Sequence, residues 1–109
     1  MNTNADRALD ALGDPTRRAV FMRLRAGTLS VGEIAEGLHV TRPAVSQHLK
    51  VLKKARLVVD RPDGTRRLYA VDTRGLGELR SWLDGFWDQT LAAFKRAAER
   101  EAADERKKR

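Results

Sequence analysis

The stretch that decides the fold reads Thr41-Arg42-Pro43-Ala44-Val45-Ser46-Gln47-His48-Leu49-Lys50-Val51-Leu52. Threonine is a favourable N-cap and proline is tolerated in a first turn, so we expect a helix from Thr41 to about Ala55. Val45, Leu49 and Leu52 are spaced i, i+4 and i+7, which places them on one side of that helix, facing a core. The opposite side carries Pro43, Gln47, Lys50 and Lys54, with Ser46 on its flank.

Three shorter helices are expected before this stretch, over about 5–12, 15–25 and 30–38. Asp14 followed by proline has the form of a helix start, and glycines end the first two segments. Ser30-Val31-Gly32-Glu33 has the form of a capping box, in which the serine and glutamate side chains each bind the other residue's backbone N–H. Only a few residues separate the third helix from Thr41, so the pair predicts a helix-turn-helix.

The hydrophobic period changes after this pair of helices. A strand is expected over 57–61, a turn at Pro62-Asp63-Gly64 and a return strand over 65–71. Asp72 or Thr73 is a candidate cap for a last helix that runs from about Leu76 into the nineties. The predicted fold is mostly α with a small β-hairpin: a winged helix-turn-helix of four helices, a hairpin wing and a final helix. We expect residues 1–98 to form this domain and 99–109 to be a charged, poorly ordered tail.

Charge indicates what the exposed side of the helix from Thr41 contacts. The chain has 109 residues and a net charge of +7, and residues 41–67 hold eight basic side chains against two acidic ones, a net of +6. A quarter of the chain thus holds nearly all of the excess, which favours a nucleic-acid partner over a generally basic protein. Serine and glutamine suit base edges in a major groove, and lysines suit phosphates.

Two features of this region have more than one interpretation. Arg61, Arg66 and Arg67 flank the hairpin turn, where they would contact phosphate or the minor groove, or merely keep an exposed sheet edge hydrated. His48 lies on the flank of its helix, where it would donate to a phosphate or pack beside the core. His39 is expected to be a solvated turn residue.

The last helix has an apolar face that covers roughly half of its circumference, wider than the ~100° stripe of an ordinary surface helix. Two such helices would cover each other in a homodimer; the alternative is that the first helix covers this face within one chain. Another interpretation of this wide face is a small-molecule pocket between paired last helices, with tryptophans as its walls. The residues assigned to the dimer interface are Leu9, Leu12, Leu79, Trp82, Leu83, Phe86, Trp87, Leu91 and Phe94.

Composition excludes several classes of protein. The absence of cysteine excludes disulfides, thiolate metal sites and thiol redox sensing. Two scattered histidines and no glycine-rich phosphate loop leave no catalytic set, so neither an enzyme nor a cofactor is expected. No stretch approaches 18 apolar residues and Met1–Asp10 has no secretory signal, so we expect a cytoplasmic protein.

Four stretches together resemble the ArsR/SmtB family of repressors: residues 41–52 its recognition helix, 11–18 the start of its second helix, 30–35 its third helix, and 64–69 its wing. The resemblance covers roughly residues 5–95. It implies a homodimer, joined through the first and last helices, that binds an inverted-repeat DNA operator, often that of its own operon. The residues assigned to DNA are Thr41, Arg42, Pro43, Ser46, Gln47, His48, Lys50, Lys54, Arg61, Arg66 and Arg67.

The metal-sensing sites of the family do not carry over. Its third-helix site needs Cys-x-Cys, where residues 33–38 read Glu-Ile-Ala-Glu-Gly-Leu, and its last-helix site needs histidine beside acids, where only Glu78, Asp84 and Asp88 are present. Bare carboxylates bind transition metals poorly. The chain looks closest to the non-metal-sensing, SdpR-like branch. The expected function is sequence-specific repression without a transition-metal inducer; the alternative is a non-specific architectural DNA-binding protein.

Overall fold

The computed structural model describes residues 3–108. The chain divides into two compact units, one ending at Leu79 and the other beginning at Arg80, and each is described by itself. No helix among the described residues is both long enough and apolar enough to span a bilayer.

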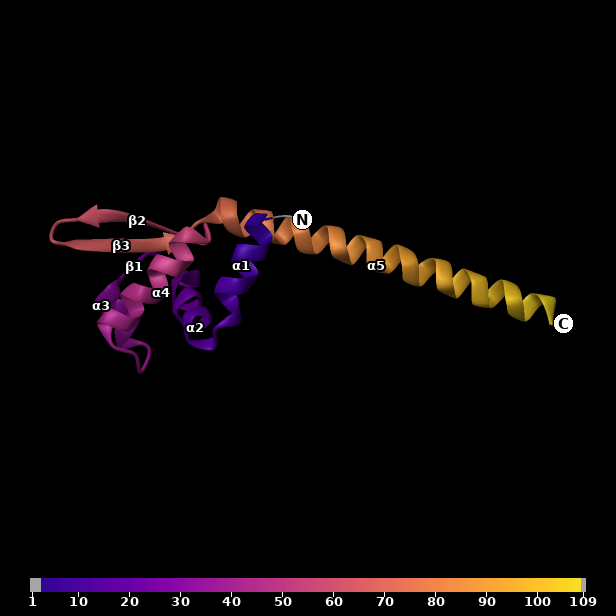
Figure 1. Cartoon of the computed structure of the whole chain (residues 1–109), viewed down its shortest axis with the longest axis horizontal. Coiled ribbons are helices and arrows are strands. Elements are labelled where there is room, and N and C mark those ends of the chain that lie inside the picture. The colour runs from indigo at the N-terminus through magenta and orange to yellow at the C-terminus, as the bar shows by residue number, and fades with distance from the viewer. Residues whose placement is uncertain (1–2, 109) are drawn as a thin grey trace. The chain divides into compact units, whose positions relative to one another are not determined.

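Helices make up most of the first unit, in the expected order (Figure 1). They are α1 (Thr3–Gly13), α2 (Pro15–Arg23) with a short 3₁₀ helix η1 (Leu24–Ala26), α3 (Val31–Glu36) and α4 (Arg42–Lys54). The caps explain these boundaries, because Asp14, Ser30 and Thr41 each accept a hydrogen bond from a backbone N–H of the first turn that follows.

The wing belongs to a three-stranded antiparallel sheet. Its strands are β1 (Leu29–Ser30), β2 (Val58–Asp63) and β3 (Arg66–Val71), in the order β1-β3-β2. Asp63 pairs with Arg66, so the turn is the two residues Gly64 and Thr65 rather than the predicted 62–64. Gly64 has φ 62°, which suits the first central position of a tight hairpin turn. The predicted hairpin is confirmed; β1 was not predicted, because two residues are too few to show a period.

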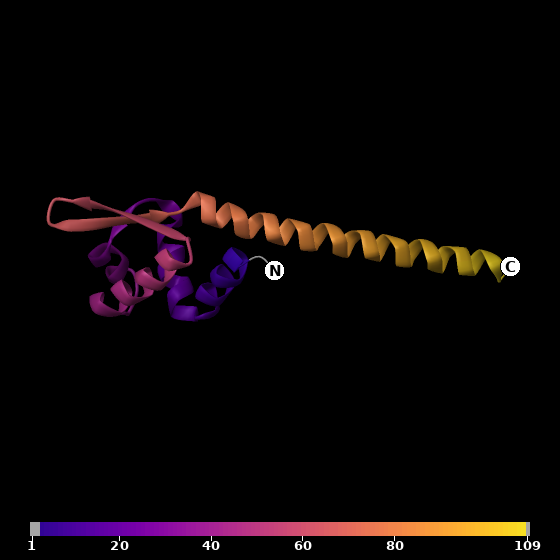
Figure 2. The same ribbon diagram turned by 45° about the horizontal axis from the view of Figure 1, so that its top comes forward.

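The core lies where α1, α2, α3 and α4 meet the base of the hairpin (Figure 2). Val45, Leu49 and Leu52 are almost completely buried, as their spacing predicts. The other large, fully buried side chains are Val20, Leu24, Ile34, Leu57 and Val58. The hydrophobic side of α4 is thus fixed, and its other side is left to solvent.

A close backbone contact joins the end of α4 to the start of α5 (Thr73–Lys107). Arg56 has φ 62°, and Leu57 N–H donates to the Leu52 carbonyl at 3.0 Å, which is the left-handed ending common after helices. A Cβ at Gly75 would overlap the Arg56 carbonyl oxygen. The low helix propensity of glycine suggests a weak helix start at Gly75. The structure gives this glycine a role, because only a residue without a Cβ allows the close contact.

Gly75→Ala is expected to lower the free energy of unfolding by about 1–3 kcal/mol, because the added methyl must displace backbone. The loss outweighs the gain of up to about 1 kcal/mol in helix propensity. Gly77→Ala is the matched control, since a Cβ there meets nothing within 4 Å, and it should stabilise slightly. Urea unfolding of the three proteins measures both effects; equal stability of the two variants would contradict the close contact.

The start of α5 is capped by Asp72, whose carboxylate accepts from Arg74 N–H at 3.1 Å. The helix then continues to Lys107, so it includes residues 99–107 of the segment that we expected to be a charged tail outside the domain. Alanine, glutamate, arginine and lysine are strong helix formers, and Lys95/Glu99 and Arg100/Asp104 are opposite charges at i, i+4 spacing. Every described side chain from Arg80 onward is exposed in the single chain.

Candidate nucleic-acid interface

The side of α4 opposite the core is open to solvent. Thr41 caps the helix by accepting from Ala44 N–H at 3.3 Å, which fixes where the exposed side begins. The predicted contact residues on this helix, His48 apart, are all exposed: Thr41, Arg42, Pro43, Ser46, Gln47, Lys50 and Lys54. Hydroxyl and amide groups lie in the first half of this side and lysines follow, the arrangement expected of a helix that reads bases and grips phosphates.

Arg42 is positioned by the absence of a side chain on α3. A Cβ at Gly32 would lie 2.9 Å from the Arg42 Nη2 atom, so the guanidinium lies directly against Gly32. This contact connects the start of α4 to the first turn of α3. Sequence reasoning assigned Arg42 to DNA but gave no role to Gly32, because the contact exists only once the two helices pack together.

Asp60 of β2 joins the wing to the end of α4. Its carboxylate lies 2.8 Å from Lys53 Nζ and 2.8 Å from Arg67 Nε, and only 9% of its side chain is exposed. These hydrogen bonds, first that of Lys53 and then that of Arg67, hold the pKa of Asp60 below its ordinary value. Asp60 and Arg67 are diagonal neighbours across the hairpin, a pairing that follows only from the correct turn.

Asp60→Asn is expected to lower the free energy of unfolding by about 1–3 kcal/mol near neutral pH, because two charge-assisted hydrogen bonds are weakened. Since the pKa of Asp60 is lower in the folded protein, its stabilisation is complete above the unfolded pKa of about 3.9 and is lost as pH falls through the folded value. Urea unfolding at several pH values checks both. The exposed Asp84→Asn is the control, and an Asp60→Asn protein as stable as that control would contradict the linkage.

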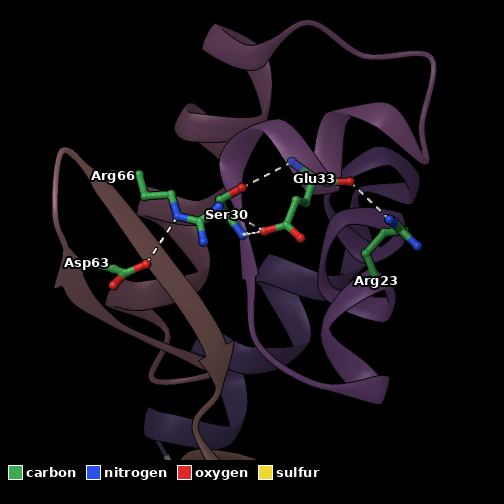
Figure 3. A network of polar contacts seen from close by, with 5 residues as sticks. All are labelled: Arg23, Ser30, Glu33, Asp63 and Arg66. Atoms are coloured by element: carbon green, nitrogen blue, oxygen red, sulfur yellow. Dashed lines mark hydrogen bonds and ion pairs between the residues drawn. The ribbon is translucent and has the colours of Figure 1, made fainter.

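Arg66, next to the turn, is held by carboxylates from two elements (Figure 3). Its Nε lies 3.2 Å from Asp63 Oδ2, and its Nη1 lies 3.7 Å from Glu33 Oε1 on α3. Glu33 also accepts from Ser30 N–H at 3.0 Å in the predicted capping box, and this hydrogen bond is the main cause of its lowered pKa. Arg23 donates to the Glu33 carbonyl at 3.0 Å, so the wing, α2 and α3 meet at one residue.

The basic side chains of this surface fall into two groups. Arg66 pairs with carboxylates that are themselves about half exposed, and such pairs are weak enough for a phosphate to replace the carboxylate. Arg67 is more than half exposed but is held by the mostly buried Asp60. Four others form no ion pair among the described residues: Arg42, Lys50, Lys54 and Arg61. Their charge is uncompensated locally, so it is available to a polyanion.

His48 faces α2 instead of the open side of α4. Its Nδ1 lies 3.7 Å from Asp14 Oδ2, and the side chain is mostly buried. Of the two interpretations of His48, this geometry favours packing beside the core over donation to a phosphate.

The second unit presents an uncovered apolar face. Phe86 and Trp87 are each 61% exposed and Phe94 is 74% exposed, while the Trp82 and Phe86 rings stack with centroids 6.3 Å apart. Leu83 and Leu91 are also exposed, as is Leu9 on α1, whereas Leu12 is half-buried against the core. Leu79, which we assigned to the interface, is only 6% exposed and is part of the core of its own chain.

Comparison with known proteins identifies the family. A helix-turn-helix domain model matches residues 12–61. The HTH-type transcriptional regulator Rv2034 of Mycobacterium tuberculosis is 57% identical over 91% of this chain and 92% of its own length. This chain is a member of the ArsR/SmtB family of winged helix-turn-helix transcriptional regulators. The transcriptional repressor SdpR of Bacillus subtilis is 34% identical to this ArsR/SmtB protein over 70% of the chain and 84% of its own length.

Solved structures of the family have the same fold. An ArsR-like transcriptional regulator from Rhodococcus sp. RHA1 superposes with a TM-score of 0.72 at 28% identity, over 87% of this chain and 92% of that one. The homodimeric winged helix-turn-helix DNA-binding domain Mb0332 of Mycobacterium bovis gives a TM-score of 0.64 at 26% identity, over 81% and 82%. The prediction of a winged helix-turn-helix is confirmed.

Within residues 3–108 of this ArsR/SmtB protein, no three His, Asp or Glu side chains are grouped so that they could hold a metal ion. Two residues that support the interface, Asp60 and Gly32, were not predicted from the sequence. The only available signal for Asp60 was its period-two alternation with Val58, which places both on the face of β2 that meets α4.

Proposed function

We propose that this protein is a sequence-specific transcriptional repressor that binds duplex DNA as a homodimer. The observation that carries the proposal is the exposed side of α4, where Ser46 and Gln47 lie beside Lys50 and Lys54, two cations without an ion pair among residues 3–108. The paired arginines of the wing extend this basic surface on β3. Because the partner is chromosomal DNA, the protein would act in the cytoplasm.

The dimer is supported by the apolar face of α5. Burial of a large apolar side chain contributes about 1.5–3 kcal/mol, and several such side chains from Trp82 to Phe94 are exposed in one chain. A second copy of α5 would cover them. A homodimeric neighbour in the same family agrees with this assignment.

A two-fold dimer presents two copies of α4 to one face of the duplex. Recognition helices in such dimers are spaced about one turn of DNA apart, roughly 34 Å, so the operator should be a pseudo-palindrome. The promoter region of the protein's own gene is the first candidate operator. We propose no transition-metal inducer, because the chain has no cysteine and its last helix no histidine.

The rival function is architectural DNA binding without sequence preference, because a basic surface alone is sufficient for binding of that kind. The two are separated by the ratio of affinities for a promoter duplex and a random duplex of equal length at fixed salt. A repressor should prefer its operator about 10³-fold or more. A ratio near one for every promoter fragment tested would support the architectural function instead.

A further inference from the structure

A cavity on the first unit lies between α1, α2 and α4, and it shares only Lys54 with the basic surface described above. Its volume is about 450 Å³, within the range of small-molecule sites. Ala11, Val51 and Ala55 give it apolar walls. This is a different place from the tryptophan-walled pocket considered for paired last helices.

The charge that lines this cavity is predominantly positive. Arg7, Arg17 and Lys54 line it, against the single acid Asp10. Arg7 and Lys54 form no ion pair among the described residues. An anion in the cavity would therefore meet two cations that nothing else in this part of the chain compensates.

Arg17 is the third cation of the lining, and it is only partly paired. Its Nη1 donates to the Ala11 carbonyl at 3.3 Å, and its Nη2 lies 3.8 Å from Asp14 Oδ2. The Nη2 separation is longer than a hydrogen bond, so this end of the guanidinium is only weakly paired. A guanidinium matches a carboxylate, and a ligand carboxylate in the cavity can compete with Asp14 for this end.

We propose that this cavity binds an organic carboxylate with a compact apolar body, and that the carboxylate acts as an effector. The apolar walls favour such a ligand over a bare phosphate, which has nothing to place against Val51. The effector role rests on the proposed function, because Lys54 belongs both to the cavity and to the DNA-facing side of α4. A carboxylate that pairs with Lys54 neutralises a positive charge that would otherwise attract the DNA phosphates, so it weakens DNA binding. By linkage, DNA weakens carboxylate binding by the same factor.

Calorimetric titration of the full chain with naphthalene-2-carboxylate tests the cavity directly, with naphthalene-2-carboxamide as the uncharged match. We expect the carboxylate to bind about tenfold more tightly than the amide. Arg17→Gln should lose about tenfold and Arg7→Gln about threefold, whereas Arg25→Gln, with the same change of charge outside the cavity, should lose nothing. Arg7 is exposed and forms no ion pair among the described residues, so its variant stays informative if Arg17→Gln unfolds. Equal binding of acid and amide, or equal loss in Arg7→Gln and Arg25→Gln, would overturn the site.

Duplex binding measured with and without the carboxylate tests the coupling. Saturating carboxylate should weaken duplex affinity about fivefold or more, and the amide should not. If carboxylate binds but duplex affinity does not change, the effector role is wrong. If Arg17→Gln weakens duplex binding while no carboxylate binds, the cavity holds a DNA phosphate and the proposal is wrong. Failure of duplex binding without any carboxylate would refute the proposed function alone, because the calorimetric titration needs no DNA.

Discussion

Phe86→Arg is expected to convert the dimer into monomers at micromolar concentration. Phe86 lies in the middle of the exposed apolar face of α5, and two-fold symmetry would remove two phenyl contacts and introduce two guanidinium groups. At about 1.5–3 kcal/mol for each buried side chain, the dimerisation constant should fall at least 100-fold. Analytical ultracentrifugation gives the mass, and circular dichroism checks that the helices remain.

Ala92→Arg is the matched control for this change. At 100° per residue, Ala92 lies on the opposite side of α5 from the apolar face, and it is exposed, so the same charge is added where no partner is expected. It should remain a dimer, and Phe86→Arg should also lose about 100-fold in operator affinity because its two recognition helices are no longer linked. A Phe86→Arg protein that keeps the dimer mass would place the interface elsewhere.

Lys50→Glu is expected to weaken binding to every duplex at least 100-fold. Lys50 is exposed, has no ion pair among the described residues and lies beside Gln47, so the substitution replaces an attraction to phosphate by repulsion in both subunits. The loss of two phosphate contacts should also flatten the slope of log affinity against log salt by about two. Fluorescence anisotropy with operator and random duplexes from 50 to 300 mM salt measures both quantities.

Two further variants test this interpretation of Lys50→Glu. Arg25→Glu makes the same change of charge on η1, away from the exposed side of α4, and should alter affinity by less than about threefold. Gln47→Ala should relax base preference while leaving the salt slope unchanged, because an amide contributes no counterion release. A Lys50→Glu protein that loses no more affinity than Arg25→Glu would remove α4 from the DNA interface.

Local signals were sufficient to predict the helix-turn-helix. Ser30 with Glu33, and Thr41 with its proline-containing first turn, determine N-caps through contacts within three residues, so the starts of α3 and α4 follow from sequence. The buried side of α4 followed from the spacing of three apolar residues. The exposed side of α4 was then inferred as the side opposite these three residues, and the candidate DNA contacts on this helix were taken from it.

What sequence did not predict depends on contacts between distant residues. Strand β1 exists because Leu29 pairs with Tyr69, and the role of Gly75 depends on its approach to Arg56. The turn was predicted at 62–64 but lies at Gly64 and Thr65, since aspartate before glycine is a common turn signal but Asp63 here pairs with Arg66. His48 lies on the margin of the apolar face of α4, and Leu79 lies within the apolar face of α5; only packing decides what covers each of them.

The central claim is that α4 lies in a major groove and is presented twice by a symmetric dimer. Selection of bound duplexes from a random pool by the full chain, followed by sequencing, tests it most directly. We predict an inverted repeat with half-site centres about 10–10.5 base pairs apart, bound by two chains. Recovery of a single unrepeated site, or of no enriched sequence at all, would contradict the account.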